Sequence, residues 1–419
     1  MSWIDITSIK HDGMQEDWTD SFREAVEQLE RNGGGTLYVP SGTYVTGPIL
    51  LKSNIILYLE TGATLLFDNY MKKYPLIQAV YAGKMMSMHQ PLIYAKNAHN
   101  IAIKGNGSLD GQGNVWWEKY LDFRKKQIQR PHMIYLENCT NVEIQGIKCL
   151  NSPAWTIHPF RCKDVRVEGV TIQNPWDSPN TDGINPNSSK NVKILNCTIH
   201  SGDDCIAIKA GTEDSQEKIS CENIQISNCM MLRGHGGVVV GSEMSGTVRN
   251  VMISDCLFRG TDRGIRLKTR RNRGGSIERI SVSHIMMEQV ISPFVCNMFY
   301  HCGERGKEKY VWDKEKYPID ETTPCIKDIF LSDITAYDVQ AAAGFVYGLP
   351  EMPVQNVRIN NCEIYMDEQA DVAYPAMMDQ LEPMAQKGFY MRNAVNVELN
   401  HVKLYGVKGK LWDRTETVQ

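Results

Sequence analysis

Residues 141–146 read NVEIQG, and similar hexapeptides return as DVRVEG at 164–169 and NVKILN at 191–196. In each of them apolar and polar residues alternate, which is the pattern of a half-buried β-strand. The first apolar residue of the repeat advances by steps of 23, 27, 32, 27 and 29 residues, through Val142, Val165, Val192, Ile224, Val251 and Ile280. Short strands at such steps, separated by turns of Asn, Gly, Ser and Asp, predict a parallel β-helix.

The N-terminal part of the chain has a different pattern. A helix is predicted from about Thr19 to Arg31, because the apolar residues of this stretch recur at helical spacing. Asn32 and Gly33 then end the helix. We expect the helix to cap the open end of the β-helix, where a sheet edge would otherwise be exposed.

The repeat extends over most of the chain, so we expect a single domain that comprises residues 1–419. The cap and the first strands are assigned to about 1–60, and the coils of the β-helix to about 97–405. Three segments rich in aromatic and charged residues interrupt the repeat, at about 68–95, 112–133 and 303–324. Because loops of this length are commonly functional, these segments are candidates for shaping a binding site.

Charge and hydropathy exclude several classes of function. The formal net charge is −4 and no basic block is present, so a nucleic-acid partner is not expected. No run of apolar residues approaches the length that crosses a membrane. The N-terminus lacks the basic start and apolar run of a secretory signal, so we expect a cytoplasmic protein.

The 12 cysteines are spread singly, and no C-x-x-C pair is present, which argues against a zinc site. Five of them directly follow Asn or Asp in similar stretches of the repeat, which are ENCTN, LNCTI, SNCMM, SDCLF and NNCEI. A small residue that recurs at one place of a repeat is usually buried, so these are interpreted as reduced thiols of the core. Neither a metal nor a cofactor is expected.

Four polar motifs follow one another at the spacing of the repeat. They are NTDG at 180–183, GDD at 202–204, GHG at 234–236 and GIRLK at 264–268. Asp182, Asp203, His235 and Arg266 are 21, 32 and 31 residues apart. Each motif alone is a common turn or a solvated face. Because residues one coil apart stack in a β-helix, the four together predict one functional patch.

These motifs, in this order, resemble the signature of glycoside hydrolase family 28, the polygalacturonases. The N-terminal stretch GGGTLYVPSGTYVTGPILLKSNIILYLETGATL is similar to the same family, and SPAWTIHP and GSEMSGTVRNV are similar to its bacterial branch, which includes exo-acting enzymes. The resemblance covers nearly the whole chain. It implies an all-β fold, a single-stranded right-handed parallel β-helix of the pectin-lyase-like kind.

The residue types themselves suit glycoside hydrolysis. An inverting glycosidase needs one protonated carboxyl group and one carboxylate that activates water. Crowded carboxylates repel one another, which raises the pKa of at least one of them. The resemblance implies that Asp203 is the general acid, that Asp182 and Asp204 activate the water, and that His235 hydrogen-bonds or tunes the acid.

Other residues are candidates for binding the substrate. Arg266 and Lys268 are two apart in a predicted strand, so they point the same way, and they suit the carboxylate of a uronic acid. Asn180 is interpreted as a substrate ligand, with a ladder asparagine as the alternative. His158 in WTIHP is either a core histidine or a subsite residue, and Tyr300 in NMFY either contacts the sugar or packs in the core.

The roles of two nearby arginines also have two interpretations. Arg271 and Arg273 in RRNRGG either bind a second carboxylate or are solvated.

The function that these observations favour is hydrolysis of α-1,4-linked galacturonate in pectic oligosaccharides, by an inverting mechanism and from one chain end. The expected partner is therefore an oligogalacturonate. One alternative keeps the fold but cleaves galacturonate–rhamnose bonds, as in rhamnogalacturonan. Another alternative, from a different class, is a non-catalytic carbohydrate-binding β-helix.

Overall fold

The computed structural model describes residues 2–9, 17–81, 83–303 and 305–415. The chain forms two compact units, Met1–Asp203 and Asp204–Gln419. Both units are built almost entirely from parallel strands, which agrees with the prediction of a parallel β-helix. That residues 1–419 form a single domain stays a prediction.

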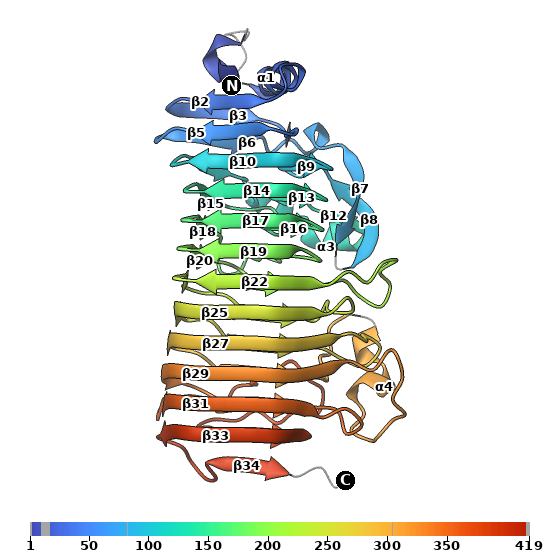
Figure 1. Cartoon of the computed structure of the whole chain (residues 1–419), viewed down its shortest axis with the longest axis vertical. Coiled ribbons are helices and arrows are strands. Elements are labelled where there is room, and N and C mark those ends of the chain that lie inside the picture. The colour runs from blue at the N-terminus through green and yellow to red at the C-terminus, as the bar shows by residue number, and fades with distance from the viewer. Residues whose placement is uncertain (1, 10–16, 82, 304, 416–419) are drawn as a thin grey trace. The chain divides into compact units, whose positions relative to one another are not determined.

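Three parallel ladders make up the first unit (Figure 1). The first contains β1 (Ser2–Asp5), β2 (Gly35–Val39), β5 (Ile55–Leu59), β10 (His99–Gly105), β14 (Thr140–Gln145), β17 (Lys163–Glu168) and β19 (Lys190–Leu195). The second contains β3 (Gly42–Thr46), β6 (Ala63–Phe67), β11 (Ser108–Asp110), β15 (Lys148–Leu150), β18 (Thr171–Gln173) and β20 (Thr198–His200). The third contains β4 (Ile49–Leu50), β9 (Ile93–Lys96), β13 (Ile134–Glu137) and β16 (Ile157–Phe160).

The second unit has two long parallel ladders. One contains β22 (Cys221–Ser227), β25 (Val248–Arg259), β27 (Ser276–Glu288), β29 (Cys325–Val339), β31 (Val354–Met366) and β33 (Ala394–Tyr405), and β23 (Met230–Met231) also pairs with β25. The other contains β21 (Asp204–Ile208), β24 (Gly236–Gly241), β26 (Arg263–Lys268), β28 (Ser292–Asn297), β30 (Ala342–Tyr347), β32 (Lys387–Arg392) and β34 (Trp412–Thr415).

The register of the strands confirms the sequence repeat in each unit. In the first unit Val142 pairs with Val165, and Val165 pairs with Val192. In the second unit Ile224 pairs with Val251, which pairs with Ile280. The apolar residues that recur in sequence are therefore neighbours between coils, where they bury one another.

The recurrence of Asn at the start of the hexapeptides is explained by its backbone conformation and its side-chain hydrogen bonds. Asn100 and Asn141 both adopt a φ near +54°, the left-handed region that Asn tolerates better than most residues. The side-chain amide of Asn141 donates to the Asn100 Oδ1 one coil away, at 2.8 Å. The same bond joins Asn191 to Asp164 at 2.8 Å. The leading position thus turns the chain into each strand and links neighbouring coils.

The predicted helix is present as α1 (Thr19–Arg31) and ends at Asn32, as the sequence indicated. Its apolar residues are buried, and they are Phe22, Ala25, Val26 and Leu29. The helix contacts β1, β2 and β4. Its role as a cap stays a prediction.

The irregular segments fold into short elements of their own. In the first unit these are η1 (Ile6–Ser8), η2 (Met71–Lys73), β7 (Leu76–Tyr81), β8 (Lys84–His89), α2 (Asn114–Trp117), α3 (Tyr120–Lys125) and β12 (Ile128–Gln129). Strands β7 and β8 form an antiparallel hairpin, and β12 extends it through β8. In the second unit they are η3 (Arg305–Lys307) and α4 (Lys309–Trp312).

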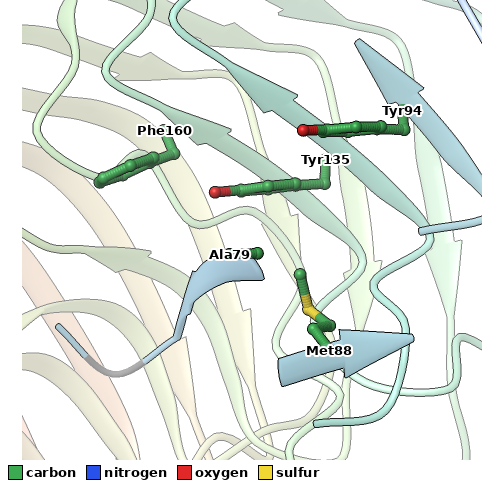
Figure 2. Close-up of a cluster of buried hydrophobic side chains, with 5 residues drawn as sticks. All are labelled: Ala79, Met88, Tyr94, Tyr135 and Phe160. Carbon is green, nitrogen blue, oxygen red and sulfur yellow. The ribbon is translucent and has the colours of Figure 1, made fainter. Parts of the chain in front are cut away.

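The β7–β8 hairpin packs on the third ladder of the first unit. Ala79 of β7 and Met88 of β8 are buried against Tyr94, Tyr135 and Phe160, one aromatic residue from each of β9, β13 and β16 (Figure 2). The rings of Tyr94 and Tyr135 stack with centroids 5.7 Å apart. Residues of segment 68–95 therefore cover an aromatic column that successive coils build.

The cysteines are present as thiols, and 10 of the 12 are buried. The five that follow Asn or Asp are all among the buried ones, which confirms their predicted place in the core. Cys302 is exposed and Cys325 is half-buried.

In the part of the chain that the structure describes, no helix has the length and apolar character needed to cross a membrane.

Candidate active site

The candidate site residues divide between the two units at the peptide bond that joins Asp203 to Asp204. The first unit contains Asn180, Asp182, Asp203 and His158 of the predicted set. The second unit contains the others, which are Asp204, His235, Arg266, Lys268 and Tyr300.

Asp182 lies in the loop between β18 and β19, on the open edge of β16. Its backbone carbonyl accepts a hydrogen bond from the Thr156 N–H at 2.9 Å, so the loop extends the third ladder. The carboxylate of Asp182 accepts from the side-chain amide of Asn185 at 3.0 Å. With 3% of its surface exposed, Asp182 is held by neutral hydrogen-bond donors in a nearly closed position.

Asp203 is positioned by a tight turn. The Gly202 N–H donates to the Thr181 hydroxyl at 3.1 Å, which ties this turn to the residue before Asp182. A Cβ atom on Gly202 would lie 2.2 Å from the Ser178 carbonyl oxygen. Only glycine therefore allows the approach of the two loops, which explains why GDD begins with this residue.

Asn180 connects the same loop to Asp203. Its φ is +54°, and its side-chain NH₂ donates to the Asp203 Oδ2 at 3.4 Å. Its Oδ1 accepts from the guanidinium group of Arg130 at 2.9 Å. The amide thus points at Arg130 and Asp203, and its role as a substrate ligand stays a prediction.

His158 lies in β16 and has none of its surface exposed. One ring nitrogen lies 3.1 Å from the Nδ1 of His132, and the other lies 3.3 Å from the side-chain amide of Asn187. Its ring also lies beside that of Tyr135, with centroids 4.9 Å apart. This placement favours the core alternative, because in this conformation the imidazole has no surface to offer a sugar.

In the second unit, Asp204 is the first residue of β21 and pairs with Gly236 of β24. A Cβ atom on Gly236 would lie 3.4 Å from the Asp204 Oδ1, so glycine keeps this side of the carboxylate open. His235 directly precedes β24 and is exposed. Its proposed influence on the general acid stays a prediction.

Asp204 forms two ion pairs with β26. The Arg266 Nη1 lies 3.4 Å from Oδ1, and the Lys268 Nζ lies 2.8 Å from Oδ2. All three side chains are buried. Arg266 and Lys268 leave β26 on the same side, as their spacing predicted, while Ile265 and Leu267 enter the core. Two cationic side chains of β26 thus share the carboxylate of Asp204.

Tyr300 joins this cluster. The centroid of its ring lies 5.7 Å from the guanidinium carbon of Arg266 and 5.2 Å from the Lys268 Nζ. Both distances suit a cation–π interaction. The sequence left the place of Tyr300 open, and the structure brings it to the two residues of the R-x-K motif.

Neither alternative for Arg271 and Arg273 describes what the structure shows, because both pair with carboxylates of this chain. Arg271 is fully buried and binds Glu351 with both ends of its guanidinium group, at 2.6 and 3.0 Å. Arg273 pairs with Glu213, which also pairs with Arg270 at 2.6 Å. Burial raises the pKa of Glu213, but the two arginines outweigh it and hold this pKa below its usual value.

Arg130 is a residue beside the site that the sequence did not single out. Its guanidinium group donates to the carbonyls of Pro153 and Pro179 and to the Asn180 side chain. Burial lowers the pKa of Arg130, and the charges of Tyr81, Tyr120 and Asp182 oppose this shift. Its hydrogen-bond partners are 23 to 50 residues away in sequence, so no local sequence motif predicts these contacts.

Carboxylate oxygens are the ligands that hard divalent cations prefer, and Asp182, Asp203 and Asp204 are the candidates for such a role. In the second unit, however, the carboxylate of Asp204 is already engaged by two cationic side chains. The Asp204 carboxylate is therefore less available to a divalent cation.

Comparison with known proteins identifies the family. Residues 35–375 match the family described as glycosyl hydrolases family 28. A probable polygalacturonase of Vitis vinifera is 32% identical over 368 residues, which cover 84% of this chain and 72% of that protein. An endo-polygalacturonase of Pectobacterium carotovorum subsp. carotovorum is 30% identical over 278 residues, 63% of this chain and 67% of that protein.

Among solved structures, a hyperthermoactive exopolygalacturonase from Thermotoga maritima has a TM-score of 0.77 and 28% identity. The alignment covers 95% of this chain and 92% of the Thermotoga chain. Family match, sequence relatives and structural neighbour agree, so this chain is a glycoside hydrolase that belongs to glycosyl hydrolases family 28.

Proposed function

We propose that this glycoside hydrolase is a polygalacturonase, which cleaves α-1,4 bonds between galacturonate units of pectic oligosaccharides. The observation that carries the proposal is the buried cluster of Asp204, Arg266 and Lys268 beside Tyr300. Its two buried cationic side chains suit the carboxylate of a uronic acid better than a neutral sugar. Polygalacturonases among its relatives support the same substrate class.

In this proposal Asp203 is the general acid. Its carboxyl group is half-buried and accepts a hydrogen bond from the Asn180 side-chain amide, and its partial exposure lets it exchange a proton. Asp204 is paired with two cations and acts, with Asp182, on the attacking water. A water between base and sugar predicts inversion of the anomeric configuration.

We further propose exo action, which occurs among the bacterial members of the family. Residues of segments 68–95 and 112–133 add a hairpin and two short helices to the first unit. Arg130 ties the second of these segments to the loop that carries Asn180 and Asp182. Additional chain on one side of the catalytic loop would limit the enzyme to one end of the oligosaccharide.

The test is a product profile from galacturonate oligomers of defined length, sampled over time, with the Asp203→Asn variant alongside. We expect monomer from the first time point, with each oligomer shortened by one unit. Turnover by the variant should fall by about 10²–10⁴-fold, the usual contribution of a positioned general acid. Its retained binding of oligomers would separate loss of chemistry from loss of fold.

Other product patterns would contradict particular parts of the proposal. Products of mixed intermediate length, or a rapid loss of viscosity of long polymer with few new reducing ends, would show endo action. Cleavage of rhamnogalacturonan oligomers alone would move the substrate to galacturonate–rhamnose bonds. Binding without any turnover would favour a non-catalytic carbohydrate-binding protein.

A further inference from the structure

We propose that Arg130 is a positioning residue, which orients the proposed general acid Asp203 through the side-chain amide of Asn180. The inference rests on the proposed function, since it assigns Arg130 a role in that same reaction. All the residues concerned belong to the first unit. The chain of contacts runs from Arg130 to the Asn180 Oδ1 at 2.9 Å, and from the Asn180 Nδ2 to the Asp203 Oδ2 at 3.4 Å.

The guanidinium group of Arg130 is fixed from several directions. Only 1% of the residue is exposed, and Nη1 donates to the carbonyls of Pro153 at 2.9 Å and Pro179 at 2.8 Å. The ring of Tyr120 lies 4.7 Å from the guanidinium carbon. Because these contacts hold the planar group in one orientation, it presents its other edge to Asn180 in a defined direction.

Burial of this cation is costly for the fold. Its hydrogen bonds go to neutral oxygens, and burial lowers the pKa of Arg130 even though Asp182 acts in the opposite direction. A buried charge without a hydrogen-bonded carboxylate destabilises a protein. The presence of such a charge is therefore explained best by a role other than stability. The geometry indicates that the orientation of Asn180 is what depends on it.

The direction of the Asn180 amide follows from the chemistry of arginine. A guanidinium group can only donate hydrogen bonds, so the Asn180 atom that faces it must be the carbonyl oxygen. The NH₂ group of the same amide is then turned toward Asp203. A flipped amide would place two donors against each other at Arg130 and two oxygens against each other at Asp203.

The consequence for Asp203 is a choice between its two oxygens. Oδ2 accepts from Asn180, and in this proposal Oδ1 carries the proton toward the leaving oxygen of the sugar. The distance of 3.4 Å is long for a hydrogen bond. Catalytic hydrogen bonds are commonly long without substrate and shorten when it binds.

The first measurement does not depend on any substrate. The titration midpoint of the Asp203 carboxyl group is followed by ¹³C NMR and assigned with Asp203→Asn. Because the Asn180 amide favours the ionised form of Asp203, its loss or misorientation should raise this midpoint. We expect higher midpoints in Arg130→Met and in Asn180→Ala, and the wild-type midpoint in Arg161→Met, a matched change elsewhere in the first unit.

Kinetics separate orientation from charge. In Arg130→Met we expect kcat to fall about 100-fold with KM changed little, since small misplacements of a reacting group have effects of this size. The limb of the pH profile at high pH should move upward, because Asp203 stays protonated longer. Arg130→Lys keeps the charge but not the planar fork, so its kcat should stay low.

The double variant Arg130→Met with Asn180→Ala decides whether the effect passes through Asn180. If it does, the double variant is no slower than the slower single variant. Additive losses, an unmoved midpoint in Arg130→Met, or full recovery by Arg130→Lys would each overturn the inference.

Failure of the inference and failure of the proposed function are distinguishable. If the wild-type enzyme cleaves galacturonate oligomers and the Asp203 titration midpoint is unchanged in Arg130→Met, only the positioning role is contradicted. A wild-type enzyme that cleaves none of them, with a midpoint that follows Arg130 and Asn180, contradicts only the substrate. Thermal unfolding of each variant checks that the fold is retained.

Discussion

Asp203 and Asp204 are neighbours in sequence, yet the two units hold them in opposite ways. On the first side, a loop positions Asp203, where the Asn180 amide donates to its carboxylate and a hydrogen bond from Gly202 to Thr181 stabilises the turn. On the second side, a strand positions Asp204, and its carboxylate is paired with Arg266 and Lys268.

The difference suits two different chemical tasks. A half-buried carboxyl group such as that of Asp203 is partly solvated in either protonation state, so it can gain and lose a proton at modest cost. A carboxylate between two buried cations cannot be neutralised without leaving an excess of positive charge in a poorly solvated place. The loop side is therefore suited to a group that changes its protonation during turnover, and the strand side to one that keeps its charge.

The largest expected effect comes from replacing each of the two aspartates with asparagine in turn, which tests the comparison directly. Asp204→Asn leaves two buried cations without their carboxylate, so the free energy of unfolding should fall by about 3–5 kcal/mol. Asp203 is only half-buried, so Asp203→Asn should change this free energy by less, about 1 kcal/mol. Urea denaturation measures both.

Equal losses of stability in the two variants would show that the two sides do not differ as described. Turnover should be lost in both, so activity alone cannot make this distinction.

A smaller effect sharpens the comparison on the loop side. In Gly202→Ala the new methyl group would lie 2.2 Å from the Ser178 carbonyl oxygen, so the turn must move and carry Asp203 with it. We expect kcat to fall about 100-fold. Gly169→Asn is the control, because Gly169 has a φ of +62° that Asn tolerates and no atom within 4 Å of its Cβ position.

Wild-type kcat in Gly202→Ala would mean that the turn tolerates the shift, and that the turn does not fix Asp203.

The smallest expected effect concerns pH and lies in the second unit, away from the proposed catalytic groups. Burial, with repulsion from Arg271, lowers the pKa of Lys314 to about 8 from 10.5. Between these pH values the unfolded chain binds more protons at Lys314 than the folded chain does. The contribution of Lys314 to the free energy of unfolding should therefore rise with pH. Below about pH 8 the contribution is constant.

The measurement is the difference in unfolding free energy between wild type and Lys314→Met from pH 7 to 11. We expect this difference to move in favour of the wild type as pH rises through 8 to 10.5. A difference that stays flat would show that Lys314 titrates normally, and that charge matters less in the second unit than its ion pairs indicate.

The repeat was readable from sequence because its information is local. A hexapeptide such as NVEIQG contains both the alternation that buries Val142 and the Asn that turns the chain. The helix Thr19–Arg31 was equally readable, since its apolar spacing and its last residues lie within one short stretch.

The candidate site was only partly readable. The R-x-K motif predicted two side chains on one side of a strand, which is what the structure shows for Arg266 and Lys268. That both would pair with Asp204, 62 and 64 residues earlier, depends on side-chain reach rather than on spacing. The place of Tyr300 depends on how the chain continues past β28, and the contacts of Arg130 depend on where segment 112–133 folds, so neither could be read from spacing.

The alternation along β26 also limits how this gene can change in length. Ile265 and Leu267 face inward while Arg266 and Lys268 face outward, so loss of one codon just before the motif would exchange the two sets. Heritable insertions and deletions are therefore expected where the chain leaves the ladders, as in segments 68–95, 112–133 and 303–324. Those segments can diverge while the motif-bearing coils keep their length, so new specificities can arise there without disturbing the proposed catalytic aspartates.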